Sequence, residues 1–191
     1  MGDGYTSRYQ VGITLNSIND ADYLSYVLDL IKELFPEPSI TIIHKKRENA
    51  VEIRLNSRIV AEFLRSMGIV PNAKSVPKWI TENPDYVKAC LRGLFDTEGH
   101  ISFKSYKSKK GVSLYKQLNF TNFNVNLMRF VRDELEEFGF KPTVSLRRSL
   151  YLSNDRDIDS FRSLIGFSNP KLVRRSLVYA YEDYQKMYNL S

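Results

Sequence analysis

The chain has few of the residues that build cross-links and soft-metal sites. Its 191 residues include one cysteine, Cys90, and two histidines, His44 and His100, which lie far apart in the sequence. A single cysteine excludes an intrachain disulfide framework and a zinc site made of several thiolates. Two histidines exclude a metal site built from several imidazoles within one chain. A hard-metal site made of carboxylates stays open.

Long apolar runs are also missing. No run approaches the ~20 residues that a membrane-spanning helix needs, and residues 1–5 lack the basic stretch followed by an apolar stretch that begins a signal peptide. We therefore expect a protein that is not secreted and that works in the cytoplasm of a prokaryote or in an organellar matrix. Twelve tyrosines and eleven phenylalanines exclude a disordered chain.

Positive charge is in excess. The 28 lysines and arginines outnumber the 22 acids and give a formal net charge of +6. This balance favours nucleic acid as a partner, although a merely soluble basic protein would show the same total. The distribution is more informative, because basic residues gather at 45–47, 104–110 and 147–148, each between two strand-like segments. The pattern indicates sheets with basic turns.

The order of predicted elements repeats along the chain. Period-two alternation predicts strands at 8–15, 40–44, 50–55, 101–106, 114–121, 143–146 and 149–152. Helical spacing with caps and stop signals predicts helices at 20–34, 57–67, 84–97, 125–138, 158–165 and 171–187. Short sequence matches accompany the repeat, such as residues 63–69 with 161–167. We interpret the chain as an internal duplication with halves at 1–82 and 83–191, although two merely similar α+β halves would look alike.

The segment 86–99 combines a face of small residues with an acid at its end. Ala89, Gly93 and Thr97 recur every four residues and so share one face of the predicted helix, which lets another helix approach closely. Glu98 follows at the C-terminal end, where the helix dipole disfavours a carboxylate and a bound cation would offset that cost. A solvated terminal glutamate is the plainer alternative.

Residues 91–99, Leu-Arg-Gly-Leu-Phe-Asp-Thr-Glu-Gly, resemble the LAGLIDADG motif of homing endonucleases. The residues that agree with the motif are Leu91, Gly93, Leu94, Asp96 and Gly99. The repeated element order resembles the family across almost the whole chain. This resemblance implies an α+β fold of two pseudo-symmetric αββαββα halves, with the two motif helices packed together. It also implies that each half offers a curved antiparallel sheet to the major groove of DNA.

The resemblance further implies a sequence-specific double-stranded DNA endonuclease of the kind encoded in introns or inteins. Such an enzyme hydrolyses phosphodiester bonds with Mg²⁺ or Mn²⁺, held by acids at the ends of the two motif helices, and takes a long target site. The positions that match the metal ligands, two acids and two backbone carbonyls, are Asp3, Glu98, Gly2 and Thr97. The positions that match the catalytic lysine of each half are Lys74 and Lys171.

Candidate DNA contacts follow from the strands and turns of the two implied sheets. Arginine, glutamine and asparagine can read base edges, whereas lysine mostly binds phosphate. The candidates in the first half are Arg8, Gln10, Thr14, His44, Lys46 and Arg54. Those in the second half are Lys104, Tyr106, Gln117, Asn119, Thr121, Arg147 and Tyr151.

The chain departs from the family at its first motif, of which only residues 2–4 match. The helix that would precede Asp3 is therefore expected from a segment upstream, and the protein would then be a monomer. Otherwise two copies pair their faces of small residues as a homodimer, or the chain is a decayed relic that binds DNA weakly.

Two other functions use the same fold. An RNA maturase binds structured intron RNA and assists splicing, and a DNA-binding regulator binds without cutting. The presence of both acids, Asp3 and Glu98, favours the nuclease, because a pure binding protein does not need them.

Overall fold

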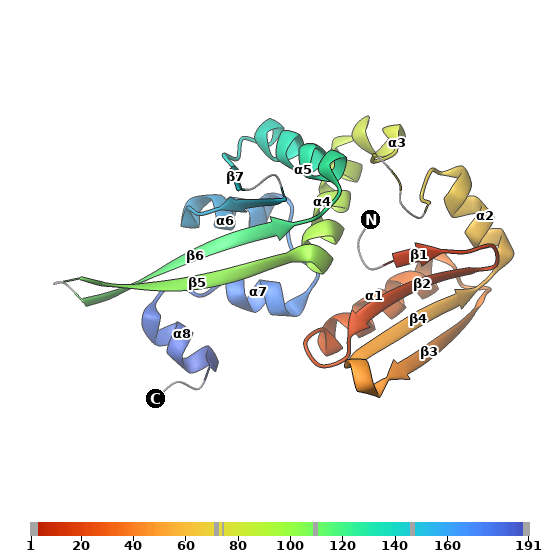
Figure 1. Ribbon diagram of the computed structural model, residues 1–191, viewed down its shortest axis with the longest axis horizontal. Coiled ribbons are helices and arrows are strands. Elements are labelled where there is room, and N and C mark those ends of the chain that lie inside the picture. The colour runs from red at the N-terminus through yellow and green to blue at the C-terminus, as the bar shows by residue number, and fades with distance from the viewer. Residues whose placement is uncertain (1–3, 71–72, 74, 109–110, 146–147, 189–191) are drawn as a thin grey trace.

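Two four-stranded antiparallel sheets lie end to end along the molecule in a computed structural model, which describes residues 4–70, 73, 75–108, 111–145 and 148–188 (Figure 1). The first sheet contains, in spatial order, β1 (Gly4–Thr6), β2 (Gln10–Asn16), β4 (Ala50–Asn56) and β3 (Ser39–Lys45). The second contains β5 (Gly99–Ser108), β6 (Gly111–Thr121), β8 (Ser149–Leu152) and β7 (Thr143–Ser145). Both sheets thus have the same strand order, as a duplication predicts.

Helices connect and cover the strands. The first half contains α1 (Ala21–Leu34), the short 3₁₀ helix η1 (Lys46–Glu48) and α2 (Arg58–Ser66). The connector carries α3 (Lys78–Thr81), and the expected boundary at residues 82–83 lies between it and α4. The second half contains α4 (Pro84–Glu98), α5 (Val125–Glu137), α6 (Asp155–Leu164), α7 (Pro170–Ser176) and α8 (Tyr181–Tyr188). The expected α+β fold of two matching halves is confirmed, with the described first half running ββαββα.

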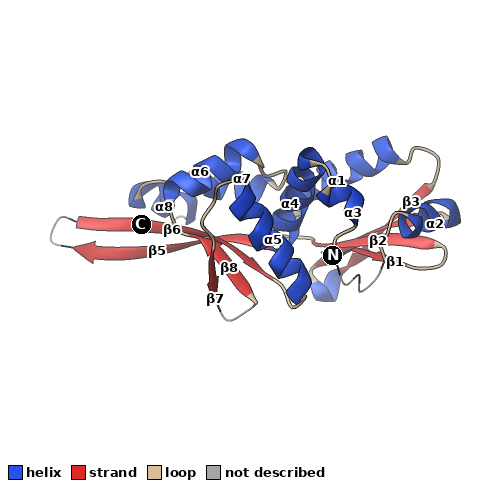
Figure 2. Ribbon diagram, turned by 90° about the horizontal axis from the view of Figure 1, so that it is seen from above, coloured by secondary structure: helices blue, strands red, loops and turns tan. Residues whose placement is uncertain are grey.

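The two sheets face the same side of the molecule. In Figure 2 the strands lie along one side, and α1, α6 and α7 lie on the other. In the first half, Leu15, Val51 and Ile53 point from the sheet toward Tyr23 and Val27 of α1. Because strand side chains alternate between faces, the neighbouring residues of β2 and β4 point to the opposite side. That side is left uncovered by α1 and forms an outer face.

The second half has the larger core. Phe95 of α4 packs against Phe161 of α6 and Phe120 of β6, with ring centroids 4.6 and 5.2 Å apart. All three rings are fully buried. Burial of this much aromatic surface is the main stabilising term for such a layer, so α4 is fixed on the second sheet.

The local start and stop signals of the helices act as predicted. Asn83 caps α4 by accepting a hydrogen bond from the Asp85 N–H, and Ser57 caps α2. Gly68 and Gly166 follow α2 and α6 with φ near +80°, a conformation that favours glycine. No helix in the described ranges is long and apolar enough to cross a membrane.

The predicted final helix at 171–187 is wrong, because it divides into α7 and α8. The cause lies in β6, where the buried Lys116 ammonium donates a hydrogen bond of 2.9 Å to the Ser176 carbonyl. In a continuous helix that carbonyl would accept from the N–H four residues later. The Tyr179 ring lies against the same ammonium, with its centroid 3.7 Å from Nζ of Lys116. The Tyr179 hydroxyl donates a hydrogen bond to the Asp159 carboxylate.

Two further differences concern the connector and the lysine-rich loop. The connector contains α3, whose Trp79 indole donates a hydrogen bond to the Met67 carbonyl. The loop predicted between 106 and 114 is largely strand, because β5 and β6 pair up to Ser108 and Gly111. Lys104 and Lys107 of β5 therefore lie on a long hairpin that extends beyond the helices (Figure 1).

Candidate functional site

Helix α4 lies at the centre of the molecule, between the two sheets (Figures 1 and 2). Leu91 and Leu94 on its core side are buried. Glu98 is its last residue and Gly99 begins β5, so the half-buried carboxylate lies where the helix meets the second sheet. Within the described part of the chain, this carboxylate has no hydrogen-bond or ion-pair partner. Its oxygens are therefore available to a cation, at the helix end where a cation is favoured.

Asp96 fixes the end of this helix. Its buried carboxylate accepts hydrogen bonds of 3.0 Å from the backbone N–H groups of Ser168 and Asn169, just before α7. Burial raises the pKa of Asp96, and the two N–H donors oppose that shift. The bonds join the C-terminal end of α4 to the N-terminal end of α7, so the positions of Glu98 and Lys171 are coupled.

Asn169 extends this junction to the first half. Its side-chain amide donates to the Asp96 carbonyl at 3.1 Å and to the Asp20 carboxylate at 3.3 Å. Asp20 also lies 4.0 Å from the Lys171 ammonium. Farther along α7, Arg174 donates to Asp22 at 3.0 Å, in an exposed ion pair. The start of α1 is thus held against α7, beside the candidate lysine.

Positive charge surrounds this junction. His100, two residues after Glu98, has its pKa lowered by burial and then by the nearby cations Arg175 and Lys171. The Arg175 guanidinium lies 5.2 Å from the Phe103 ring centroid. Cations at this position would favour the approach of a phosphate.

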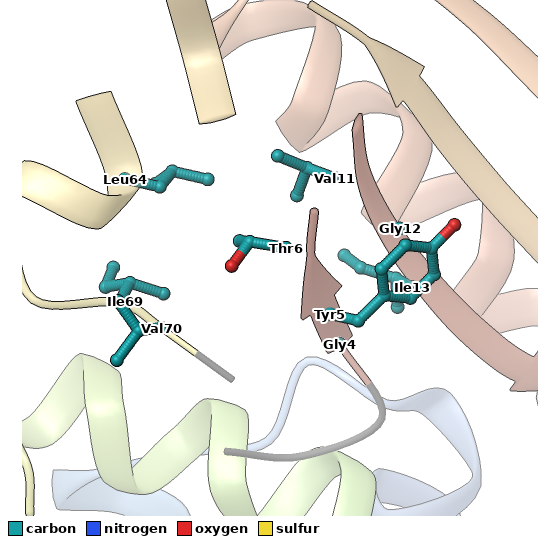
Figure 3. Close-up of a pocket in the computed structure, with 9 residues that line it drawn as sticks. All are labelled: Gly4, Tyr5, Thr6, Val11, Gly12, Ile13, Leu64, Ile69 and Val70. Atoms are coloured by element: carbon teal, nitrogen blue, oxygen red, sulfur yellow. The ribbon is translucent and has the colours of Figure 1, made fainter. Parts of the chain in front are cut away.

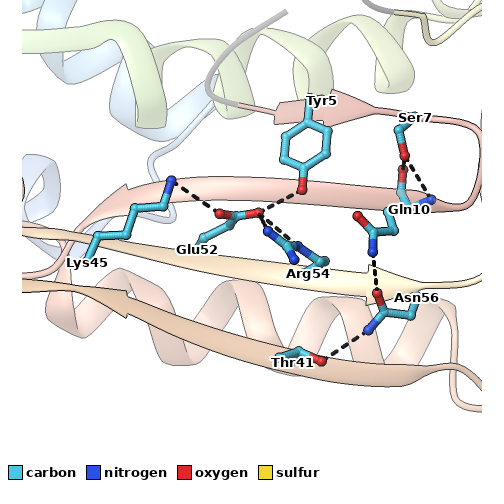
Figure 4. A network of polar contacts seen from close by, with 8 residues as sticks. All are labelled: Tyr5, Ser7, Gln10, Thr41, Lys45, Glu52, Arg54 and Asn56. Atoms are coloured by element: carbon cyan, nitrogen blue, oxygen red, sulfur yellow. Dashed lines mark hydrogen bonds and ion pairs between the residues drawn. The ribbon is translucent and has the colours of Figure 1, made fainter.

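The outer face of the first sheet carries a network of charged groups around Glu52 (Figure 4). Its carboxylate accepts hydrogen bonds from the Tyr5 hydroxyl at 2.7 Å and from Arg54 at 2.8 and 3.1 Å. The Lys45 ammonium lies 3.3 Å away. The hydrogen bond from Tyr5, followed by that from Arg54, lowers the pKa of Glu52 to about 2. The carboxylate is therefore charged at neutral pH, and its two cations leave this patch with a net positive charge.

A second network on the same face is neutral (Figure 4). Gln10 donates to Asn56 at 3.0 Å, and Asn56 donates to the Thr41 hydroxyl at 3.1 Å. These bonds cross three neighbouring strands and hold amide groups at the surface. Amides held in this way can donate to and accept from base edges.

The outer face of the second sheet is also polar. Gln117, Asn119 and Thr121 alternate along β6 with the buried Leu118 and Phe120, as predicted for a surface strand. Gln117 donates to the Tyr115 hydroxyl, and the Thr121 hydroxyl lies 3.2 Å from that of Ser149. The Asn119 amide donates to the Ser102 hydroxyl and to the backbone carbonyls of Gln117 and His100. Tyr151 pairs with Asn119 and so shares this face. Both sheets therefore present polar and basic side chains to the same side of the molecule.

A family model for a LAGLIDADG-like domain matches residues 85–166 of this chain. The second half of the chain is therefore similar to LAGLIDADG-like domains. The matched region begins in α4 and ends just after α6, so it covers the second half. No curated protein matches the sequence.

Solved structures of LAGLIDADG homing endonucleases share the fold over most of the chain. A variant of I-DmoI matches with a TM-score of 0.58 and 22% identity, over 86% of this chain and 89% of that one. The meganuclease I-AabMI, bound to uncleaved DNA, matches with a TM-score of 0.61 and 16% identity, over 99% and 94%. I-LtrWI, bound to target DNA, matches with a TM-score of 0.57 and 13% identity, over 95% and 78%. At these identities the likeness shows the fold alone.

The LAGLIDADG candidates for metal binding and catalysis divide into two groups. Gly2, Asp3 and Lys74 lie outside the described residues. Glu98 and Lys171 lie at the two helix ends that Asp96 joins. Thr97 donates from its hydroxyl to the Gly93 carbonyl at 3.0 Å, which leaves its own backbone carbonyl as the candidate ligand. Among the described residues, no group of three or more acids, histidines and cysteines could hold a metal ion.

The DNA-contact candidates of the two sheets mostly lie on the outer faces. Those whose pairing or position puts them there are Gln10, Thr14, Arg54, Lys104, Tyr106, Gln117, Asn119, Thr121 and Tyr151. Arg8 is exposed in the turn between β1 and β2. The side chain of Lys46 and all of Arg147 lie outside the described parts.

His44 lies on the wrong face for a DNA contact. It pairs with the buried Val51, so its side chain points to the same side as the core. Its neighbour Lys45 points to the outer face, where its ammonium forms an ion pair with the Glu52 carboxylate. Because side chains alternate, an error of one residue changes the face, and Lys45 replaces His44 as the candidate.

The face of small residues on α4 lacks a partner among the described residues. Ala89 and Gly93 are exposed, and a Cβ added to Gly93 would meet no described atom within 4 Å. An apolar pocket of about 190 Å³ opens nearby, between β1, β2 and the end of α2 (Figure 3). Leu64 and Ile69 line it, and the Thr6 hydroxyl is buried there without a partner in the described chain.

Three residues that organise the site were assigned no structural role from the sequence. Glu52, Asp96 and Asn169 are all buried and polar, and each binds groups far away in the sequence. Buried polar residues are rare unless they are paired. A polar residue within an apolar strand or helix pattern was the signal available, but it did not identify the partners.

Proposed function

We propose that the chain is a sequence-specific double-stranded DNA endonuclease that hydrolyses phosphodiester bonds with a divalent metal ion, Mg²⁺ or Mn²⁺. The observation that carries this proposal is the position of Glu98. An unpaired carboxylate ends the central helix, between two sheets whose polar faces point to the same side. Similar proteins support it: structures of I-DmoI contain target DNA with Mn, Ca or Mg.

The donor set fits a hard metal ion. Glu98 offers carboxylate oxygens and Thr97 a backbone carbonyl, and Mg²⁺ prefers oxygen ligands together with water and phosphate. Asp3 and the carbonyl of Gly2 would complete the ligands from the first half. When bound, the metal would activate water and stabilise charge on the leaving oxygen.

The residues of the chain supply the positioning. The outer faces hold the duplex through polar contacts to bases and basic contacts to phosphates. The hydrogen bonds of Asp96 fix the end of α4, so Glu98 is presented without a further conformational change. Lys171, beside Asp20, would place an ammonium group against a phosphate oxygen near the scissile bond.

The face of small residues on α4 has no partner among the described residues, and we propose two sources for a second helix that would cover it. A segment upstream of residue 4 would give a monomer, and α4 of a second copy would give a homodimer. Light scattering of the 191-residue chain, with and without Mg²⁺, distinguishes a monomer from a dimer. In the dimer, Glu98 of each copy would form the catalytic pair.

The test of the function is the pair of variants Glu98→Gln and Glu82→Gln. Glu82 is exposed and lies just before α4. On a target selected by the wild-type chain, we expect Glu98→Gln to lose cleavage and to keep DNA binding, while Glu82→Gln keeps both. Equal loss of binding and cleavage would make Glu98 structural and contradict the proposal. A wild-type chain that binds DNA or structured RNA and never cuts would be a regulator or a maturase.

A further inference from the structure

One carboxylate stands on the face that the proposed function assigns to DNA. Glu52 of β4 pairs with Thr14 of β2 and Ile43 of β3, so its side chain lies on the outer face. It is nevertheless only 4% exposed. An unpaired carboxylate here would repel phosphates and carry an uncompensated charge. Its burial and its three partners, Tyr5, Arg54 and Lys45, make Glu52 part of a fixed network on this face.

Both oxygens of the carboxylate contact protein donors. One oxygen accepts from the Tyr5 hydroxyl and from two nitrogens of Arg54, and the other faces the Lys45 ammonium at 3.3 Å. Three donors occupy Oε1, and with Glu52 only 4% exposed its remaining acceptor capacity on Oε2 is shielded from a base. Its action on DNA has to pass through the residues that it holds.

The first sheet is shaped to allow this arrangement. Tyr5 pairs with Gly12, which pairs in turn with Arg54 on the next strand. A Cβ on Gly12 would lie 2.2 Å from Cε1 of the Tyr5 ring. The ring thus crosses β2 over bare backbone to reach Glu52 (Figure 4), and a side chain at position 12 would block it.

Arg54 keeps one edge of its guanidinium free. Arginine has five N–H donors, and Glu52 engages the Nε side and Nη2. The hydrogen bonds to Glu52 do not use Nη1, and the Arg54 side chain is 31% exposed. Two N–H groups on one guanidinium edge match O6 and N7 of guanine. An arginine without a fixed orientation would bind any phosphate and carry no sequence information.

We propose that Glu52 is a positioning residue that holds Arg54 to recognise one guanine in the major groove. The inference rests on the proposed function, because it assumes that the outer face of the first sheet meets DNA. A bidentate contact of this kind discriminates between bases by about 5- to 150-fold.

The test is selection from a randomised duplex library in the presence of a chelator, so that bound DNA is not cut. The variants are Glu52→Gln, Arg54→Ala and the milder Tyr5→Phe. The matched control is Glu62→Gln, because Glu62 accepts a 2.7 Å bond from Arg58 in an exposed pair on α2. Total affinity for random duplex and thermal unfolding are measured for each variant.

We expect the wild-type chain to prefer guanine at one position and Arg54→Ala to lose that preference. Glu52→Gln should reduce it at least about fivefold at the same position, while affinity for random duplex holds or rises because a negative charge is gone. Tyr5→Phe should give a smaller reduction there, and Glu62→Gln none. Tyr5→Phe decides the matter if Glu52→Gln fails to fold.

Three results would overturn the inference. Glu52→Gln and Tyr5→Phe could keep the full guanine preference, Arg54→Ala could change no position, or Glu52→Gln could weaken all positions equally. In each case a wild-type chain that selects a long target leaves the proposed function standing. A wild-type chain that selects no sequence removes the proposed function, and this inference with it.

Discussion

Replacing Asp96 with alanine tests the junction that positions the end of α4. The substitution removes the acceptor of two backbone N–H groups, that of the half-buried Ser168 and that of the buried Asn169. Each buried donor left without a partner costs about 1–3 kcal/mol, which gives roughly 2–6 kcal/mol for the pair. Burial raises the pKa of Asp96, so removing this acid recovers part of its desolvation cost. We therefore expect the lower part of the range, about 2–4 kcal/mol.

The control for this experiment lies on the same helix. Asp85 is 86% exposed in the first turn of α4 and pairs with Lys88 at 3.3 Å. Asp85→Ala removes a favourable charge at the helix N-terminus and should cost about 0.3–1 kcal/mol. Asp96→Asn keeps one acceptor oxygen and should fall between the two alanine variants.

The assay is urea unfolding followed by circular dichroism and by fluorescence of the single tryptophan. Trp79 lies against Tyr86 of α4, with ring centroids 5.7 Å apart, so its signal reports on this helix. A cost for Asp96→Ala no larger than that for Asp85→Ala would refute the reasoning, because the junction would then contribute no more than a surface charge.

Three further predictions concern other parts of the molecule. The pKa of Glu52 is lowered from 4.5 to about 2 in the folded chain, so its stabilising contribution is complete above about pH 4.5 and is lost as the pH falls toward 2. The stability of Glu52→Gln should therefore fall less than that of the wild type over this pH range. An equal loss of stability in the two proteins would contradict the role of Glu52. Thr6→Val replaces a hydroxyl that is buried without a partner in the described chain by a methyl group. This change should raise the free energy of unfolding by ~1 kcal/mol. A lower free energy of unfolding in urea would show that the hydroxyl is hydrogen-bonded. Lys116→Met removes the donor to the Ser176 carbonyl. It should speed hydrogen exchange in residues 177–188, while the amides of β6 stay protected. Unchanged exchange in residues 177–188 would contradict the explanation for the division of α7 and α8.

Helix α4 shows what the sequence could predict. Its start depends on Asn83 and Pro84 and its end on Gly99, all neighbours in the chain. The motif acid Glu98 follows directly from that register. The duplication was visible for the same reason, because each half carries its own local signals. Periodicity and capping are short-range effects, and they recovered the order of the elements in both halves.

Most of the incorrect or missing predictions have a different cause. Tyr5 and Glu52 are 47 residues apart, and Asp96 and Asn169 are 73 apart, so no local pattern could pair them. The end of α7 depends on a lysine 60 residues earlier. His44 was assigned to the outer face through an error of one position, which alternation turns into the opposite face. Tertiary contacts decided every one of these cases except that of His44, whose face follows from alternation along its own strand.

Cleavage of DNA by the unmodified chain tests the central claim most directly. The measurement is incubation with a randomised library of long duplex targets in Mg²⁺, in Mn²⁺ and in chelator, followed by sequencing of the cut ends. We predict cuts at one selected site in the presence of either metal and none in chelator. Enrichment of bound sequences without cut ends in either metal would contradict the nuclease and leave a DNA-binding protein of the same fold.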